Sequence, residues 1–395
     1  MSCGYHHGLV LAKQDEHIWN FISIQGSHTI PTEHSDVYRV RTGYERVVAH
    51  RVTKTFAGIA QGKGKVTRID ENAKLVEVTY TDGKVDLFKF GDQIVEAESI
   101  GIMQHIEVAV QVGQPVEKGD VITYNTSFFK QDPVTKQLDM SIGVTANVAF
   151  IECDMTNEDS FQISKECAEK MAIAPVNSRD VVLSTKALIH SSVDIGEEVT
   201  PSSPLMIFEN EALTDTPADE DPEILALLSD VNRSTPKAKH SGKVVRIDAY
   251  FGCPIDQMSP TVAKLVRKCI SSKVQTYKLA KETGNESEFQ PVTPIQPGNK
   301  FHGVMFDEDT LLLVYHIQER IPHGVGDKLV VANQLKCTCA SVFENRPVSE
   351  SGVPIDLIFS QKAQNNRICV SPIQMGIISR IMEQTEKDVV AEYFG

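Results

Sequence analysis

The sequence lacks any run of about eighteen apolar residues, which excludes a conventional transmembrane helix. Its first residues, MSCGYHHGLVLAKQDEHIW, contain no basic segment followed by a long apolar core, so we expect no secretory signal. The chain also lacks a C-x-x-C pair, which argues against a zinc knuckle. The scattered cysteines are better interpreted as buried free thiols of a reducing cytoplasm. Cys337 and Cys339 alternate on a predicted strand and should share one buried face.

Basic residues are outnumbered by acidic ones, 39 to 53, which gives a net charge of −14. This sign argues against a protein that binds nucleic acid by itself. Residues 231–281 are the exception, with eleven Lys and Arg against two acids, a local balance of +9 that leaves −23 for the remainder. An acidic, proline-containing run, TDTPADEDPE (214–223), precedes this segment and is typical of an exposed linker or loop. The basic segment either forms a surface that faces nucleic acid or forms a solvated helix face whose positive charge is compensated by a neighbouring subunit. The candidates for nucleic-acid binding are Lys237, Lys239, Lys243 and Arg246.

Strand patterns dominate the chain, with fewer helices. Residues 66–90 alternate apolar and polar residues around two turn sequences, which predicts three consecutive strands. Residues 108–123 and 193–208 share a strand, a G-x-x-V turn and a second strand, which indicates a weak internal repeat. Helices are predicted at 164–171 with Ser164 as N-cap, from Ser259-Pro260 to about residue 281, and at 372–382. His6, His7 and His323 have no partners at metal-ligand spacing.

Two lysines eight residues apart, Lys328 and Lys336, stand in the run ERIPHGVGDKLVVANQLK. A hydrophobic strand (311–317) leads to a Gly326-Asp327 turn, and we expect both lysines within one short loop after it. Lysine is a compact point charge that suits phosphate binding. On spacing alone, two solvated surface lysines would be the commoner interpretation.

The surrounding motifs favour phosphate binding, because they resemble those of the β subunit of multisubunit RNA polymerases. RTGYERVVA (41–49), VEKGDVI (116–122), ANVAFIECDMTNEDSFQIS (146–164), the lysine pair and SGVPIDLIFSQKAQNNRICVSPIQ (351–374) occur in the order of that family. The similarity extends from about residue 30 to residue 382, with a poorly matched middle. Each match alone is weak, whereas five in order, with the family's lysine spacing, are hard to obtain by chance.

The departures from the family pattern are also informative. The RHGNKG sequence around the second lysine is replaced by residues 332–337, ANQLKC, with the loss of an arginine, a histidine and two glycines. We therefore expect an altered path for this loop, since glycine permits close backbone approach and positive φ. The amino-terminal half of a bacterial β subunit and the carboxy-terminal clamp segment have no counterpart here. The chain thus looks like a split, divergent β subunit, similar to those of giant (jumbo) bacteriophages.

The resemblance implies a mainly β fold with some α (α+β), containing a double-psi β-barrel built from discontinuous segments. Residues 1–35 would be an amino-terminal extension, 36–190 and 310–382 the two parts of the barrel region, and 383–395 a tail. Residues 191–309 would form the inserted flap- or wall-like region. In this family the principal Mg²⁺ site is a triple-aspartate loop of the β′ subunit, and the present sequence contains no D-x-D-x-D run.

The chain would therefore supply counter-charge to a nucleotidyl-transfer centre that a β′-like partner completes. By matching position, Lys328 and Lys336 would contact the RNA 3′-end phosphate and the nucleotide phosphates. Arg46 and Arg367 would contact the nucleotide triphosphate, with Arg41 as a second candidate in the first motif. Glu158 and Asp159, of which Asp159 is the closer match, would help to hold only the second, nucleotide-borne Mg²⁺.

Each of these residues also has a structural interpretation. Arg46 could form a surface salt bridge with Glu45 or another acid, and Arg367 could likewise have a structural role. Glu158 and Asp159 could compensate charge at the N-terminus of the helix that follows Ser164.

Two functions remain open at this point. The first is a DNA-directed RNA polymerase subunit, enzymatically active only in complex with another β-like fragment and β′-like subunits, and acting on DNA template, RNA product and nucleoside triphosphates. The second is a polymerase-like scaffold that has lost catalysis. A biotinyl- or lipoyl-carrier domain is excluded, because neither G-x-x-V hairpin presents a lysine at its tip. The expected location is the cytoplasm of an infected host cell, with packaging in the virion as an option.

Overall fold

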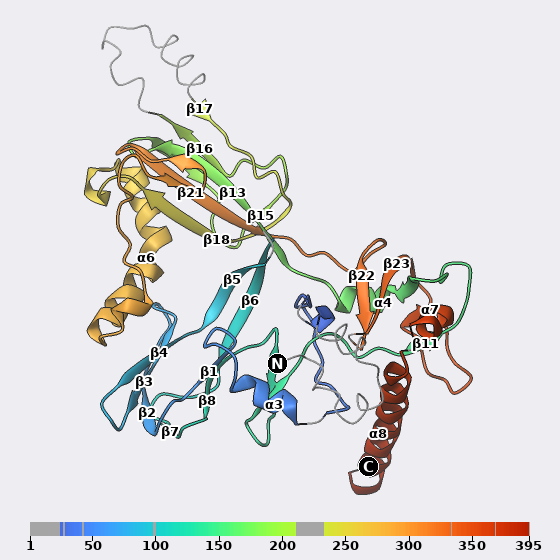
Figure 1. Ribbon diagram of the computed structural model, residues 1–395. Helices are drawn as coiled ribbons and strands as arrows, with labels where there is room; N and C mark the ends of the chain where they lie inside the picture. Colours follow the sequence, from blue (N-terminus) through green and yellow to red (C-terminus); the bar gives the residue numbers. More distant parts are fainter. Residues whose placement is uncertain are drawn as a thin grey trace.

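The computed structural model describes residues 24–26, 28–41, 43–97, 100–210, 233–332, 334–367 and 369–394. These residues form a mixed α+β fold made mostly of strands, with curled, half-barrel sheets and few helices (Figure 1). The acidic run 214–223, His6, His7 and Cys3 lie outside the described residues. None of the described helices is long and apolar enough to cross a membrane.

The predicted run of three strands in 66–90 is confirmed. Strands β2 (Gly64–Asp70), β3 (Leu75–Tyr80) and β4 (Val85–Lys89) form an antiparallel sheet with β7 (Pro115–Val116), in the order β4-β3-β2-β7. Alternate side chains of β3 are buried, as expected for a sheet with one covered face. This sheet forms the lower-left part of Figure 1.

A larger sheet connects this part to the upper part of the molecule. Its order is β1-β8-β6-β13-β21-β18-β15, with β5 paired to β6. The central strand β21 (Thr310–Gln318) pairs along its length with both β13 (Pro175–Ser184) and β18 (Gly242–Phe251). The predicted strand at 311–317 is therefore confirmed, and all seven of its residues are buried. The sheet combines strands of the two predicted barrel segments, 36–190 and 310–382, with β15 and β18 of the predicted insertion, 191–309. Its remaining strands are β1 (Ala57–Ile59), β5 (Gly91–Ala97), β6 (Ile100–Val108), β8 (Val121–Asn125) and β15 (Glu198–Val199).

The two G-x-x-V turns have the same backbone geometry. The N–H of Gly113 donates to Val66 O at 2.8 Å, and the N–H of Val66 donates to Gln114 O at 3.0 Å. In the second copy, Gly196 donates to Val244 O at 2.7 Å and Val244 donates to Glu197 O at 2.9 Å. Both glycines have positive φ, 88° and 100°, which favours glycine at the turn.

The strands that receive these turns are also similar in sequence. GKVTRID forms β2 (64–70) and GKVVRID opens β18 (242–248), identical at six of seven positions. The order of turn and strand along the chain is reversed between the copies. The structure thus contains two related half-barrels, one around β2 and one around β18. The turn sequences alone had only indicated this repeat.

Helix α6 (Pro260–Glu282) begins as predicted after Ser259, whose Oγ accepts a hydrogen bond from Val262 N at 3.3 Å. Val262, Val266 and Ile270 are buried against the β18–β21 sheet. The distal end packs on the β4-β3-β2-β7 sheet, because Thr276 Oγ1 donates at 2.8 Å to the carbonyl of Ala73, in the turn between β2 and β3, and Leu279 is buried in one cluster with Leu75 of β3. The helix therefore connects the two half-barrels, as Figure 1 shows.

The third part, at the right of Figure 1, is a five-stranded sheet in the order β11-β24-β12-β23-β22. The strands are β11 (Val148–Phe150), β12 (Ser160–Ser164), β22 (Lys328–Val331), β23 (Leu335–Phe343) and β24 (Leu357–Phe359). Helix α4 (Lys165–Lys170) confirms the predicted cap, since Ser164 Oγ accepts from Cys167 N at 3.2 Å. Cys337 and Cys339 are both 2% exposed in one core cluster, as the alternation predicted.

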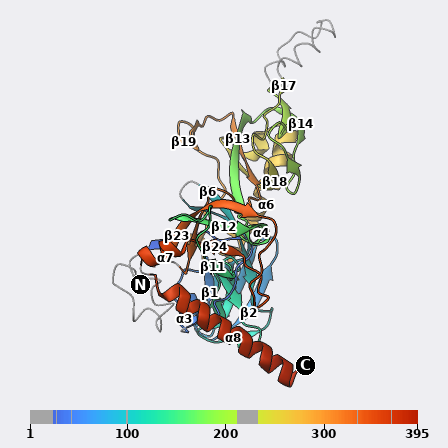
Figure 2. The ribbon, with the colours of Figure 1, turned by 90° about the vertical axis from the view of Figure 1, so that its right-hand side faces the viewer.

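Helix α8 (Ser371–Tyr393) begins close to its predicted start but does not end at residue 382. Only Ser371 and Pro372 are buried in it. Its predicted apolar residues Ile373, Ile377, Ile378 and Ile381 are 37–61% exposed. Figures 1 and 2 show the carboxy-terminal half projecting past the neighbouring elements.

Candidate functional site

Lys328 and Lys336 lie on one face of a β-hairpin. Lys328 is opposite Thr338 and Lys336 is opposite Val330 in the antiparallel register of β22 and β23. Cross-strand partners share a face of the sheet, so the two lysines are diagonal neighbours whose side-chain origins are about 7–8 Å apart. The expectation that both lie in one loop is wrong, because the backbone continues as paired strands on either side of a short turn.

The opposite face of the hairpin anchors it to the core. Leu335 is fully buried and Cys337 is 2% exposed, while Leu329 and Val331 pack on the same cluster. This alternation holds the lysine face outward, because a shift of one residue would place the lysines in the core. Lys328 is exposed and Lys336 is half-buried. Neither ammonium forms an ion pair in the described part of the chain. The nearby acids Asp327, Glu158 and Asp159 instead contact His323, Lys362 and Arg367, respectively.

Arg367 joins the lysine hairpin to the predicted acidic element. Its Nη2 donates to Asp159 Oδ1 at 2.8 Å and its Nη1 donates to the backbone carbonyl of Lys336 at 3.2 Å. Arg367 caps the C-terminus of helix α7 (Gln361–Asn366), and the helix N-cap Ser360 positions that short helix after β24. The backbone of Asp159 is fixed in turn, since its carbonyl accepts from Thr338 N at 2.9 Å. Arg367 therefore links Asp159 to the backbone of β23 at Lys336, whereas no contact among the described residues joins this ion pair to the ammonium group of Lys328 or Lys336.

Glu158 lies beside Asp159 in a left-handed backbone conformation (φ 53°) and contacts Lys362 Nζ at 3.7 Å. Both carboxylates are largely exposed, with 71% and 63% of their side-chain surfaces accessible. Strand β12 separates them from helix α4, so they do not compensate the N-terminus of that helix. We find no group of three or more His, Cys, Asp or Glu side chains with metal-site geometry among the described residues. One or two exposed carboxylates fit a Mg²⁺ that arrives with nucleotide phosphates and water, and do not make a resident site.

Arg41 and Arg46 form a separate cluster around a buried carboxylate. Arg46, in helix α3 (Tyr44–Ala49), donates from Nε to Asp139 Oδ1 at 2.9 Å, and Arg41 Nη1 donates to Asp139 Oδ2 at 2.7 Å. Asp139 is 4% exposed on β10 (Leu138–Met140), and Asp132 contacts Arg46 at 3.2 Å. The hydrogen bond and charge of Asp139 raise the pKa of Arg46. Both guanidiniums thus neutralise acids, and no contact among the described residues connects either of them to the lysine hairpin.

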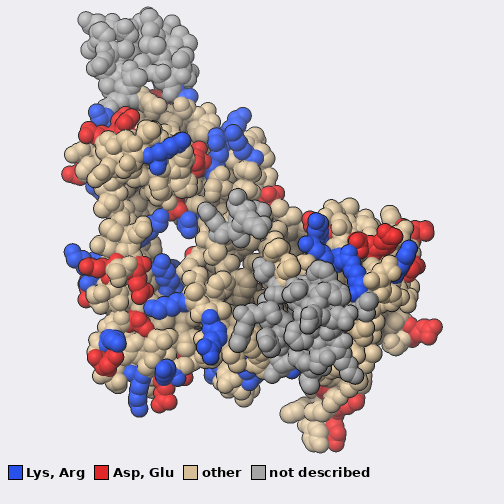
Figure 3. Space-filling model, in the orientation of Figure 1, with Lys and Arg blue, Asp and Glu red and all other residues tan. Residues whose placement is uncertain are grey.

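The four basic candidates of the middle segment do not share one environment. Lys237, Lys239 and Lys243 are exposed on strands and loops around β18, not on a helix. Arg246 instead contacts buried Asp248 at 2.8 Å. Lys273 and His316 bind the same carboxylate at 2.7 and 3.0 Å. On the face seen in Figure 3, Lys and Arg alternate with acidic side chains and do not form one continuous basic surface.

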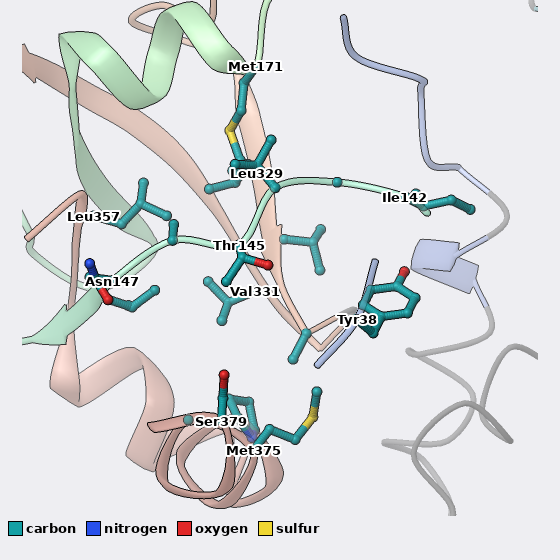
Figure 4. A pocket seen from close by; sticks show the side chains of 18 of the residues that line it. Tyr38, Ile142, Thr145, Asn147, Met171, Leu329, Val331, Leu357, Met375 and Ser379 are labelled. Atoms are coloured by element: carbon teal, nitrogen blue, oxygen red, sulfur yellow. The ribbon is translucent and has the colours of Figure 1, made fainter. Parts of the chain in front are cut away.

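A cavity of about 1430 Å³ opens beside the lysine hairpin. Lys328, Lys336, the segment 142–150 and the first turns of α8 line it, and most of its lining is apolar (Figure 4). Figure 4 shows Leu329 and Val331 on one side and Met375 and Ser379 of α8 on the other.

Two arginines of this cavity were missed by sequence reasoning, and a third polar residue, His323, was named there only as lacking partners at metal-ligand spacing. Arg39 and Arg380 line it, and both bind Glu383, at 3.1 and 2.6 Å. Arg39 stands two residues before Arg41, just outside the 41–49 motif. His323 also lines the cavity, and its Nε2 has no hydrogen-bond partner among the described residues. Burial lowers the pKa of His323, which keeps the ring neutral near pH 7.

No known protein-family profile matches the chain, and no curated protein is significantly similar to it.

Proposed function

We propose that this chain is the carboxy-terminal, β-like subunit of a split, multisubunit DNA-directed RNA polymerase of the giant-phage type. The observation that carries the proposal is that Arg367 binds Asp159, 208 residues earlier in the sequence, and also the backbone carbonyl of Lys336, on the hairpin that presents Lys328 and Lys336 on one face. These motifs occur in the order of the β subunit family. A double-psi arrangement of the barrel segments belongs to the same proposal.

In this function the two lysines bind phosphate oxygens, and their hairpin holds them at a fixed separation. The buried opposite face of the hairpin gives that geometry its rigidity, and positioning together with cationic stabilisation supplies most of the catalysis in phosphoryl transfer. The principal Mg²⁺ would be held by a β′-like partner. Asp159 would face the second ion carried by the nucleotide, and Arg367 would then exchange its carboxylate partner for the triphosphate.

A non-catalytic scaffold is the second candidate, and one observation favours it. Three of the five predicted cations, Arg41, Arg46 and Arg367, already neutralise carboxylates. Among the described residues the ammonium groups of Lys328 and Lys336 form no ion pair, and this favours the catalytic proposal, since a scaffold does not require two neighbouring cations without counter-charge.

The proposal is tested by purifying the native complex through a tag on this chain and identifying the other polypeptides. We expect a second β-like fragment and β′-like chains, and Mg²⁺-dependent RNA extension by the complex on a preassembled RNA–DNA scaffold. The isolated chain should be inactive and bind Mg²⁺ only weakly, because it has no aspartate triad. A solitary, stable monomer, or nucleotide incorporation by the isolated chain, would overturn the proposal.

A further inference from the structure

The five-stranded sheet that carries the lysine hairpin has two open edges, and both border the same cavity. Its order, β11-β24-β12-β23-β22, leaves β11 and β22 each with one paired neighbour among the described strands. The cavity of about 1430 Å³ is lined by consecutive residues of both edge strands, Val148–Phe150 and Lys328–Val331. Successive side chains of a strand point to opposite faces, so a cavity that touches all of them lies along the free edge of the strand.

The apolar core of this sheet is incomplete along these edges. In the middle strands the inward side chains are fully buried, as Phe161 of β12 and Phe359 of β24 show with 0% exposure. Leu329 and Val331 of β22 pack on the same core but are only half-buried, beside the cavity (Figure 4), and β11 is half-buried along its length. Because protein cores are close-packed, a segment that completes this core must present apolar side chains to β22.

The free edge of β22 also presents backbone hydrogen-bonding groups. Cys339 N donates to Asp327 O at 2.8 Å, and hydrogen-bonded residues alternate along an antiparallel pair. Counting from Asp327, Lys328 and Val330 therefore direct their N–H and C=O groups away from β23, to the open edge. No loop of the described chain binds these groups. An added strand satisfies them, whereas an α-helix already bonds its own backbone internally, so the edge selects an extended polypeptide.

Positive charge on the other face of this edge restricts the sequence of such a segment. Residues of an added strand that lie directly opposite Lys328 and Val330 share their face of the sheet. Lys328 is exposed on this face with Lys336 diagonal to it, and neither ammonium forms an ion pair among the described residues. Acidic residues at the opposite positions would supply counter-charge, while the residues between them would face the core.

We propose that the open edge of β22 binds an extended segment of another polypeptide, in which acidic and apolar residues alternate. At the spacings of a β-sheet one strand residue occupies about 160 Å³, so the cavity has room for about eight residues. Two copies of β22 paired along this edge would place the lysines of both on one face, which like charge disfavours. Acidic side chains from a different polypeptide relieve that charge.

The acidic residues of the segment would compete with nucleotide phosphates for Lys328, which makes the segment a reversible cover of the lysine pair. Only this consequence rests on the proposed function. The strand pairing does not, and its test measures binding to the chain without any polymerase activity.

The test uses the full chain and three synthetic octapeptides with capped ends. The Glu peptide alternates Glu with Val, and the Lys peptide alternates Lys with Val. The third is the Glu peptide methylated on the backbone nitrogens of its Glu residues, whose N–H groups would face β22. In titration calorimetry we expect the Glu peptide to bind at least about tenfold more tightly than the Lys peptide at low ionic strength. The methylated peptide should not bind, because it cannot donate to the strand edge.

Variants of the chain locate the binding. Val330→Pro removes an N–H group that makes no bond to β23, and proline is tolerated on edge strands, so this variant should keep its fold and lose the Glu peptide. Val330→Thr keeps the N–H group and should bind normally. Lys328→Glu should reverse the preference in favour of the Lys peptide, whereas Lys362→Glu, at an exposed position nearby, should not. Circular dichroism checks the fold of each variant.

Several results would overturn the proposal. Equal affinity for the Glu and Lys peptides would remove its charge basis, and undiminished binding of the methylated peptide would remove the strand pairing. Absence of binding, together with an amine-specific cross-link between Lys328 and Lys13, would identify the amino-terminal segment of this chain as the occupant. Concentration-dependent dimerisation in sedimentation velocity, lost in Val330→Pro, would identify a second copy instead.

Discussion

The guanidinium of Arg367 contacts the carboxylate of Asp159 at 2.8 Å across 208 residues of sequence. The same side chain reaches the carbonyl of Lys336 at 3.2 Å, so one arginine connects the segments that carry three of the predicted site residues. Both members of the ion pair are substantially exposed, 38% for Arg367 and 63% for Asp159. An exposed pair of this kind contributes little to stability and can exchange partners readily.

We predict that Arg367→Gln lowers the free energy of unfolding of the chain by no more than about 1 kcal/mol, measured by urea denaturation. In the proposed polymerase complex the same variant should raise the nucleotide KM at least about tenfold, since a charge-assisted contact to phosphate is worth about 1.5–3 kcal/mol. Arg320→Gln is the control, because Arg320 is also half-exposed and binds two acids, Glu33 and Glu169. An unchanged KM in Arg367→Gln would leave this arginine with a structural role alone.

The second prediction concerns Lys336. Replacement by Met keeps much of the side-chain volume and removes the charge from a half-buried position. Losing one electrostatic contact to a transition state costs about 3–4 kcal/mol, so the proposed polymerase complex with this variant should bind template normally and extend RNA at least about a hundredfold more slowly. Lys336→Arg should recover only part of the rate, because a guanidinium does not reproduce the compact ammonium.

The assay is single-nucleotide extension on a preassembled RNA–DNA scaffold, which separates chemistry from promoter opening. Lys362→Met is the matched control, since Lys362 is exposed near the same site but pairs with Glu158. Extension at full rate by Lys336→Met would show that the altered hairpin does not reach the reacting phosphates, and would favour the scaffold function.

Features set by local sequence could be predicted. The serine caps of α4 and α6 depend on residues within three positions, and the burial of Cys337 and Cys339 depends only on strand alternation. The strand around Leu311 to Ile317 could be predicted because its apolar run is continuous.

Features that depend on distant partners could not be predicted. The acid that holds Arg46 is 93 residues away on β10, and nothing near Arg46 in the sequence indicates it. The full length of α8 was missed because its last turns are apolar without being buried, so they carry no core signal. The repeat of GKV-x-RID was missed because its two copies stand on opposite sides of their turns in chain order.

The third prediction concerns the exposed lysines around β18. Arg246 is excluded from the test because it neutralises Asp248. If Lys237, Lys239 and Lys243 contact duplex phosphates, the triple Ser variant should flatten the salt dependence of template binding by the complex by about 0.9 log unit per lost contact.

The control for this variant removes the same charge elsewhere in the basic segment. Lys264, Arg267 and Lys278 are exposed on α6, and their replacement by Ser tests whether net charge alone changes the slope. Equal slopes for the two triple variants would contradict a specific nucleic-acid path along β18.

The last prediction concerns the buried carboxylate of Asp248, which is 3% exposed and contacts Arg246, Lys273 and His316. Burial acts to raise its pKa, but the hydrogen bond with His316 and the charges of Arg246 and Lys273 lower the pKa overall. Asp248→Asn removes the charge while keeping the shape. Because Arg246 and Lys273 are half-exposed and regain water, we expect a loss of about 1.5–3 kcal/mol in the free energy of unfolding. Asp256→Asn, at an exposed position, should change it by less than about 0.5 kcal/mol.

The pH dependence of this loss follows from the sign of the pKa shift. A carboxyl whose pKa is lower in the folded state stabilises the protein above the unfolded pKa of about 3.9, and this stabilisation is lost as the pH falls through the folded value. The deficit of Asp248→Asn in urea denaturation should therefore be at least as large at pH 5 as at pH 7. A deficit that is much smaller at pH 5 than at pH 7 would show that the carboxylate is not held in its charged form by these three partners.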